Sequence, residues 1–352
     1  MSMTPRERWL ALFHRKKPDH IPTDYWATPE VTDRLLKELR CENLRVLCIK
    51  LHIDLPEVLG AVRLSSAMPR NPLQDIWGAR YRIVKYGTGE YREVDTHPLA
   101  TTTSVAEIEA FPWPDPYAYD WSHFGKQVER LTGRYPVRCG TFEPFLLYCA
   151  MRGLEQSMAD LVEEPEIADA ILERIFDFHY RHLERMFELA KGKVDFTYVA
   201  EDLGSQASLL IGLPQIRRFL LPNQKRMADL ARHHGIHIFY HTDGAAREVI
   251  PDLVSVTGIE LLNPIQWRCP GMEREGLVRD FGEHLIFHGA MDNQFTLPFG
   301  TVEDVKQEVL DNLRIFSGAR WVCAPCHNLQ PVTPTANIVA MYETIWENGR
   351  LQ

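Results

Sequence analysis

The chain has 352 residues, of which 45% are hydrophobic and 25% charged, a composition typical of soluble globular proteins. Its formal net charge of -9, with no run of five like charges, argues against nucleic acid or an anionic membrane surface as the main partner. No apolar run approaches the roughly 18 residues that cross a bilayer, so we expect neither a signal peptide nor a transmembrane anchor.

Short apolar segments alternate with amphipathic segments along most of the chain. The predicted strands are residues 21–26, 137–142, 196–200, 236–240, 259–263, 285–288 and 321–325. Apolar residues at helical spacing predict helices over 164–191, 214–234 and 301–316. Strands that are apolar throughout and separated by helices indicate parallel pairing with both faces covered. We therefore expect the α/β class and a (β/α)8 TIM barrel, formed as a single domain over residues 1–352 with an N-terminal helical extension.

The seven cysteines are odd in number and thinly spread, which is typical of a reducing compartment, and we expect a cytoplasmic location. Cys323 and Cys326 form a Cys-x-x-Cys pair, which suggests thiol redox chemistry. Such a pair normally opens a helix, whereas this pair ends an apolar run. We therefore favour thiols that are free or bound to a metal.

Polar side chains gather directly after the predicted strands, where barrel enzymes build their active sites. Loops of this kind are polar in general, so one cluster alone means little, but six clusters together favour a site. The residues that we expect to bind substrate are Glu143, Glu201, Asp202, Asn263, Gln266, His288 and Asp292. Amide and carboxylate groups suit a polar substrate, although His288 and Asp292 could instead brace neighbouring loops.

His241 and Asp243 give the sharpest local signal, because alternation along a strand puts both side chains on one side. With a third ligand from a neighbouring strand end and a water molecule, they would form an open catalytic zinc site. Cys326 and His327 are the candidates for the third ligand. The alternative is that Asp243 only orients His241 or caps the following helix.

Eight segments spread over nearly the whole chain form a pattern that is specific as a set. They are residues 4–9, 17–22, 201–244, 263–264, 287–292, 297–301, 324–334 and 337–342. This set resembles the uroporphyrinogen decarboxylase superfamily, which implies a (β/α)8 barrel. The superfamily contains cofactor-free porphyrinogen decarboxylases and zinc-dependent methyltransferases of the methylcobamide:coenzyme M type, which move a methyl group between a corrinoid protein and a thiol or related acceptor.

Resemblance to the decarboxylase branch is incomplete. That branch has an Arg-Gln-x-Gly-Arg segment after its first strand, whereas residues 23–28 here read Thr-Asp-Tyr-Trp-Ala-Thr. A substrate with many carboxylates needs guanidinium partners, so their loss argues against a true porphyrinogen decarboxylase. Asp54, Tyr148 and His327 nevertheless match the aspartate, tyrosine and C-terminal histidine of that branch.

Resemblance to the methyltransferase branch centres on the zinc ligands, which there are a His-x-Cys pair and a cysteine near the C-terminus. His241 matches the histidine, and Asp243 stands in place of the first cysteine. His327 stands in place of the second, with Cys326 beside it. Nitrogen and oxygen ligands still suit zinc, but losing thiolates makes the site less soft.

Three functions follow as hypotheses. The first is a corrinoid-linked methyltransferase, in which zinc lowers the pKa of an acceptor thiol and a methyl-corrinoid on a partner protein is the co-substrate. The second is a cofactor-independent decarboxylase, a lyase acting on a polar carboxylic acid, with Asp54, Tyr148 and His327 at its centre. If zinc is absent, His241 and His327 would act as general acid and base. Asp243 would then orient a histidine or bind a carboxylate. The third is a non-catalytic corrinoid-binding or small-molecule-binding protein. The sequence leaves the acceptor and the oligomeric state open, a homodimer included.

Overall fold

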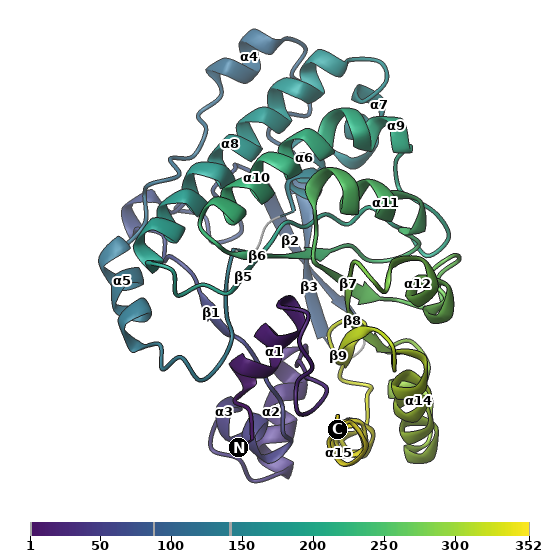
Figure 1. The fold of residues 1–352 in the computed structure, drawn as a ribbon. Helices are drawn as coiled ribbons and strands as arrows, with labels where there is room; N and C mark the ends of the chain where they lie inside the picture. The colour runs from purple at the N-terminus through teal and green to yellow at the C-terminus, as the bar shows by residue number, and fades with distance from the viewer. Residues whose placement is uncertain (1, 87–88, 141–142, 352) are drawn as a thin grey trace.

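The computed structural model describes residues 2–86, 89–140 and 143–351. Seven parallel strands form a curled sheet with helices packed on its outer face (Figure 1). In sheet order they are β1 (Glu57–Leu59), β4 (Val137–Cys139), β5 (Phe196–Tyr198), β6 (His237–His241), β7 (Leu261–Ile265), β8 (Ile286–Met291) and β9 (Arg320–Pro325). Every neighbouring pair is parallel, as the apolar runs predicted. Residues 141 and 142 of the predicted strand 137–142 lie outside the described residues.

The predicted strand over residues 21–26 differs from expectation, because it pairs only through isolated bridges. Thr23 is bridged to Cys323 of β9, and Ala27 to Leu329, both in the parallel sense. Pro22 has no N–H to offer a ladder. The Thr23 hydroxyl bonds the carbonyl of His52 at 3.1 Å and so reaches the segment that leads into β1. The α/β class and the curled parallel sheet are confirmed, while the ladder of described strands is not a closed ring of eight.

The concave face of the sheet is lined by every second strand residue, as the period of a β-strand requires. Its apolar members are Phe196, Tyr198, Ala200, Phe239, Leu261, Ile286 and Val322. Helix α1 (Pro5–Phe13), which starts at a Thr4–Glu7 capping box, packs against them. Trp9 stacks on Phe196 with ring centroids 5.2 Å apart. The N-terminal helix is therefore part of the core rather than an extension beyond it.

The remaining helices cover the outer face or connect the strands. They are α2 (Pro29–Glu38), α3 (Leu44–Lys50), α4 (Val105–Ala110), α5 (Trp121–Arg130), α6 (Pro144–Arg152), α7 (Leu154–Asp160), α8 (Pro165–Ala190), α9 (Leu213–Gln215), α10 (Leu221–His233), α11 (Ile250–Asp252), α12 (Arg274–Phe281), α13 (Thr296–Phe299), α14 (Val302–Ile315) and α15 (Thr335–Asn348). The three long helices predicted from apolar spacing are confirmed as α8, α9 with α10, and α14. Helices α9 and α10 are joined by a π-helical turn, Ile216–Leu220. Over the described residues, none of the helices has the length and apolarity needed to cross a bilayer.

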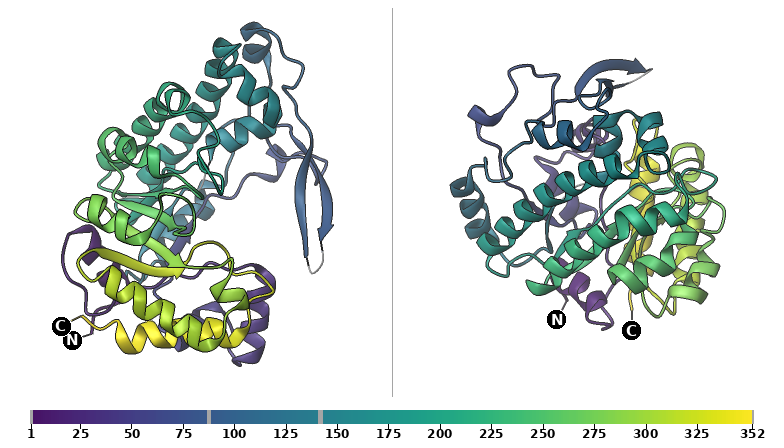
Figure 2. Two further views of the ribbon diagram at one scale, coloured as in Figure 1. Left: turned by 90° about the vertical axis from the view of Figure 1, so that its right-hand side faces the viewer. Right: turned by 90° about the horizontal axis from the view of Figure 1, so that it is seen from above.

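One element stands apart from the parallel sheet. Strands β2 (Arg80–Tyr86) and β3 (Gly89–Thr96) pair in the antiparallel sense and project from the body of the protein, as Figure 2 shows. The residue pattern does not predict this hairpin, because its charged residues leave no clear apolar alternation. The single-domain organisation stays a prediction.

Candidate active site

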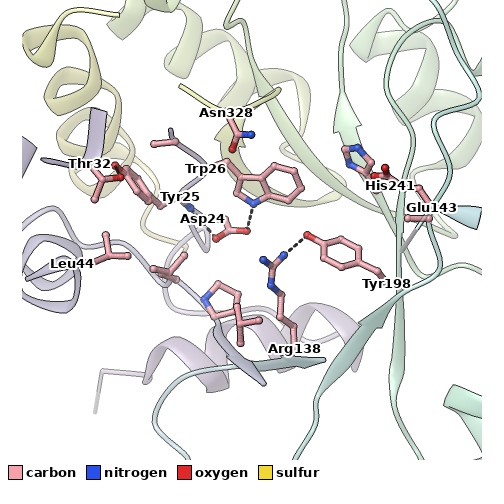
Figure 3. Close-up of a pocket in the computed structure, with 15 residues that line it drawn as sticks. Asp24, Tyr25, Trp26, Thr32, Leu44, Arg138, Glu143, Tyr198, His241 and Asn328 are labelled. Carbon is pink, nitrogen blue, oxygen red and sulfur yellow. Dashed lines mark hydrogen bonds between the residues drawn. The ribbon is translucent and has the colours of Figure 1, made fainter. Parts of the chain in front are cut away.

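A cavity of about 390 Å³ opens at the carboxyl ends of the strands, next to the segment 24–27 (Figure 3). This is the end at which barrel enzymes place their chemistry. The charged and hydrogen-bonding side chains that line it include Asp24, Arg138, Glu143, Tyr198, His241 and Asn328. They come from the segment before α2, from β4, from the residue that precedes α6, from β5 and β6, and from the chain that follows β9, so distant parts of the sequence meet in one cavity.

Three side chains converge at one end of this cavity. His241 ends β6, Asp202 lies shortly after β5, and Glu143 immediately precedes α6. One ligand atom from each lies within 4.8 Å of the others. The Nε2 atom of His241 is 3.4 Å from Oδ1 of Asp202. Three neighbouring strands therefore deliver one imidazole nitrogen and two carboxylates to the same point.

A chain of hydrogen bonds holds His241 from behind. Its Nδ1–H donates to Oδ1 of Asn263 at 2.5 Å, and Nδ2 of Asn263 donates to Nδ1 of His288 at 2.7 Å. Nε2–H of His288 donates to Oδ2 of Asp24 at 3.1 Å. Because an amide has one accepting and one donating end, this order assigns the protons: His241 carries one on Nδ1, which leaves Nε2 facing the carboxylates. Metal-binding histidines in proteins are commonly oriented in this way.

The charges at this end of the cavity are strongly coupled. Burial alone would lower the pKa of His241, but its hydrogen bond to Asp202 and the charge of Asp243 raise that pKa to about 9. Burial would raise the pKa of Asp202, yet the same hydrogen bond keeps it below its ordinary value. Burial, helped by the charge of Asp202, raises the pKa of Glu143. The carboxylates therefore attract positive charge, whether a proton on Nε2 or a metal ion.

The donor atoms fit a divalent metal ion. One imidazole and two carboxylates form a set that zinc accepts, with further positions left for a water or a substrate. The carboxylate of Asp243 stands beside this group, with Oδ2 4.0 Å from Nε2 of His241. Its Oδ1 is buried and has no hydrogen-bond partner among the described residues. An unpartnered buried carboxylate oxygen is costly unless a cation or proton satisfies it, so Asp243 also fits a metal site.

Cys326 and His327 were predicted as candidates for the third ligand. Neither belongs to the group formed by Glu143, Asp202 and His241. The thiol of Cys326 is buried and donates to the carbonyl of Ile265 at 3.1 Å, and burial raises its pKa well above the ordinary value. His327 lies at the rim with its side chain 48% exposed, and its Nε2 is 3.9 Å from Oδ2 of Asp243. Asp202 and Glu143, which were expected to bind substrate, lie with His241 in the group that could hold a metal ion.

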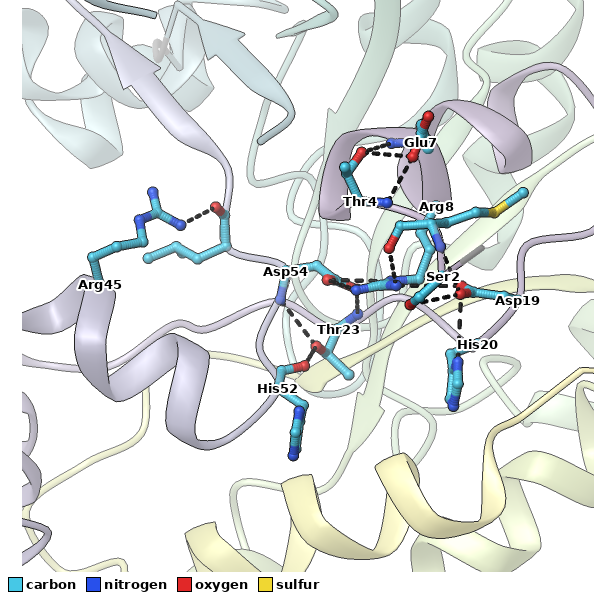
Figure 4. Close-up of polar contacts among 12 residues, drawn as sticks. Ser2, Thr4, Glu7, Arg8, Asp19, His20, Thr23, Arg45, His52 and Asp54 are labelled. Carbon is cyan, nitrogen blue, oxygen red and sulfur yellow. Dashed lines mark hydrogen bonds and ion pairs between the residues drawn. The ribbon is translucent and has the colours of Figure 1, made fainter. Parts of the chain in front are cut away.

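Asp54 and Tyr148 lie away from the cavity. Asp54 is buried in an ion pair with Arg8 of α1 at 2.8 Å, in the polar cluster of Figure 4. The Tyr148 hydroxyl donates to Asp160 of α7 at 3.1 Å, and Arg152 pairs with the same carboxylate. The structure gives both residues contacts that hold helices in place and does not bring them to His241.

The other predicted substrate-binding residues have different positions. Glu201 is buried and both of its carboxylate oxygens accept from the backbone N–H of Phe145, each at 2.9 Å. Gln266 accepts from Gly244 N at 2.9 Å, and Asp292 accepts from backbone amides that follow it, among them Gln294 N at 2.9 Å. These three side chains brace loops, the alternative left open for Asp292.

Four functional candidates were missed from the sequence: Asp24, Trp26, Arg138 and Tyr198. Asp24 accepts from Nε1 of Trp26 at 2.9 Å, and Arg138 donates to the hydroxyl of Tyr198. A signal did exist. Arg138 is a charged residue inside an apolar strand, and Asp24 and Trp26 are two residues apart in the predicted strand 21–26, so they share a face.

A curled parallel sheet with a polar cavity at its carboxyl edge defines an α/β protein of the barrel-enzyme class. The family model for uroporphyrinogen decarboxylase (URO-D) matches residues 84–347, so the chain belongs to this family, whose members are enzymes. The resemblance inferred from the sequence is thereby confirmed.

Individual relatives are distant. A stretch of 128 residues, 36% of this chain, is 28% identical to uroporphyrinogen decarboxylases of Prochlorococcus marinus strains MIT 9303 and MIT 9313, and it spans only 34% of their length. A methyltransferase from Methanosarcina mazei matches over 98% of this chain and 99% of its own, with a TM-score of 0.70 and 16% identity. At that identity the match establishes a shared fold.

Proposed function

We propose that this protein is a zinc-dependent methyltransferase that transfers a methyl group from a methyl-corrinoid on a partner protein to a small thiol or related acceptor. The observation that carries the proposal is the convergence of Glu143, Asp202 and His241 at the end of a cavity large enough for a small molecule. The fold shared with the Methanosarcina mazei methyltransferase supports it.

Glu143, Asp202 and His241 would hold the metal ion, with Asp243 beside them. Bound zinc supplies Lewis acidity, which lowers the pKa of a coordinated thiol so that the thiolate exists near neutral pH. Asn263 keeps the proton of His241 on Nδ1, so that Nε2 presents its lone pair to the site. Trp26 and Ala200 line the same cavity and would limit the access of water to the acceptor.

In the transfer step the acceptor sulfur forms a bond to the methyl carbon. The cobalt–carbon bond breaks, and its electron pair stays on cobalt, which leaves as the cob(I) form. The thiol proton has by then passed to solvent through the cavity mouth. Atoms and electrons balance without an oxidant or a reductant.

Metal analysis of the purified protein, combined with an assay using methylcob(III)alamin and a thiol, tests the proposal. We expect one zinc ion per chain and cob(I)alamin formation, with both lost in His241→Ala. His284→Ala, a change at an exposed histidine, is the matched control and should retain both. Wild-type protein without stoichiometric metal, or His241→Ala protein that keeps it, would contradict the proposal.

Decarboxylation is the second candidate function, favoured by the 28% identical stretch shared with uroporphyrinogen decarboxylases. It would require carbon dioxide release from an acid by metal-free protein. The contacts of Asp54 and Tyr148 with Arg8 and Asp160 leave this route without two of the side chains that the sequence assigned to it. If the protein binds small molecules but catalyses neither methyl transfer nor decarboxylation, a non-catalytic role remains.

A further inference from the structure

We propose that the substrate held in this cavity is an organic monoanion: a carboxylate or sulfonate group pairs with Arg138, an apolar body lies along Trp26, and the reacting atom faces His241. This inference rests on the proposed function and adds the substrate class. Three features of the cavity carry it: an arginine that pairs with no carboxylate of the described chain, a phenol beside that arginine, and an apolar wall.

Arg138 lies on β4 and its guanidinium points into the cavity toward Tyr198 (Figure 3). It donates to the Tyr198 hydroxyl, and it pairs with no carboxylate within 4.0 Å among the residues that the structure describes. A guanidinium carries five N–H donors in a planar fork that matches a carboxylate. An arginine with donors to spare at the wall of a cavity is equipped to hold an anion.

Asp24 also lines the cavity, but both of its carboxylate oxygens already accept hydrogen bonds. Oδ1 accepts from Tyr25 N at 2.8 Å, and Oδ2 accepts from Nε1 of Trp26 at 2.9 Å and from Nε2 of His288 at 3.1 Å. Its hydrogen-bond partners are therefore its own segment and His288, the histidine at the end of the hydrogen-bond chain behind His241. Asp24 is therefore not the partner that Arg138 lacks.

Tyr198 completes the anion subsite. Its oxygen accepts the hydrogen bond from Arg138, so its own proton is available for donation to a ligand. Burial raises the pKa of Tyr198, and the hydroxyl therefore remains protonated at neutral pH. Arg138 and Tyr198 together offer one positive charge and several donors directed at one place.

Apolar side chains form much of the remaining wall. Leu44, Leu55, Pro56 and Val58 line it together with the ring of Trp26. A cavity of about 390 Å³ suits a small molecule with an apolar body. One arginine neutralises one anionic group, so a polycarboxylate such as a porphyrinogen would bury further charges without partners here.

Calorimetric titration of the purified, metal-containing protein tests the inference with four probes: phenylacetate, its neutral isostere phenylacetamide, phenylmethanesulfonate and acetate. We expect phenylacetate to bind at least tenfold more tightly than phenylacetamide, and also than acetate, which lacks the apolar body. Comparison of phenylmethanesulfonate with phenylacetate shows whether the guanidinium of Arg138 prefers a sulfonate or a carboxylate. Equal affinities for phenylacetate and phenylacetamide would overturn the inference.

Substitutions at Arg138 and Tyr198 test whether these two side chains bind the anionic group. Arg138→Gln should weaken phenylacetate binding at least tenfold and leave phenylacetamide binding unchanged, while Arg138→Lys should restore only part of the loss. Arg134→Gln, at an exposed arginine just before β4, is the matched control and should change nothing. If Arg138→Gln does not fold, Tyr198→Phe removes one donor and should selectively weaken anion binding. Unchanged phenylacetate binding in a folded variant would contradict the subsite.

The failure of this inference is distinguishable from the failure of the proposed function. Anion binding at Arg138 does not require the metal, so His241→Ala protein should still prefer phenylacetate over phenylacetamide. Selective anion binding by wild-type protein that holds no metal would overturn the function and support the subsite. Metal-dependent methyl transfer without preference for an anion would overturn the subsite alone.

Discussion

The side-chain oxygen of Asn263 lies 2.5 Å from Nδ1 of His241, and this contact determines which imidazole nitrogen faces the carboxylates of the site. The other end of the same amide donates to Nδ1 of His288. Asn263 is therefore a positioning residue, because it sets the proton and the ring orientation of His241 without itself entering the ligand group. Two conservative substitutions separate these contributions.

Asn263→Leu should lower zinc affinity about 10–100-fold, because it removes the acceptor that orients His241. Asn263→Asp keeps an acceptor opposite Nδ1 of His241 and should retain most of the affinity, although it cannot donate to His288 in the same way. Competitive titration with a chelating dye measures both. Equal zinc affinity in Asn263→Leu and wild-type protein would show that the hydrogen bond from His241 to Asn263 does not contribute to metal binding.

Asp202→Asn should reduce zinc affinity more than Asp243→Asn does. Asp202 belongs to the ligand group, whereas Asp243 approaches Nε2 of His241 only to 4.0 Å. We expect a loss of about tenfold or more for Asp202→Asn, since an amide oxygen brings no charge to the metal. Isothermal titration of metal-free protein with zinc measures the difference, and the reverse order of losses would favour the His241–Asp243 pair predicted from the sequence.

Much of the fold follows from the sequence, because buried parallel strands are uninterrupted apolar runs. Strand β1 (Glu57–Leu59) was missed because it is three residues long and only partly buried. Glu143, Asp202 and His241 were all recognised as strand-end residues. Their grouping was not, because the path of the chain after each strand decides which side chains meet, and the residue pattern does not record that path.

Tyr148→Phe should leave activity unchanged and cost about 1 kcal/mol of unfolding free energy, since its hydroxyl donates to Asp160 rather than to a substrate. Urea denaturation and the methyl-transfer assay together measure this. A large loss of turnover with unchanged stability would instead place Tyr148 in catalysis and revive the decarboxylase assignment.

Asp54→Asn should destabilise the fold by roughly 3 kcal/mol, because it leaves the buried guanidinium of Arg8 with less charge to pair with. Asp19 still pairs with Arg8 at 3.2 Å and keeps the loss from being larger. Asp33→Asn, at an exposed aspartate of α2, serves as the control. A loss no larger than that of the control would show that the Arg8–Asp54 pair contributes little to stability.

His179 predicts a pH dependence of stability. Burial, together with the nearby His182, lowers its pKa from 6.5 to about 3, so the folded chain keeps this imidazole neutral. Below pH 6.5 the imidazole of His179 takes up a proton in the unfolded chain but stays neutral in the folded chain. The free energy of unfolding therefore falls with falling pH between 6.5 and about 3. Urea denaturation at pH 7 and pH 5 should show a smaller fall in His179→Gln than in wild-type protein, and equal falls would contradict this assignment.

X-ray absorption spectroscopy of the zinc-loaded protein tests the central claim most directly, because it counts the ligand atoms by type. The convergence of Glu143, Asp202 and His241 predicts a first shell of nitrogen and oxygen at about 2.0–2.2 Å with no sulfur. A sulfur neighbour at about 2.3 Å would show that a cysteine such as Cys326 holds the metal, and would contradict the site described here.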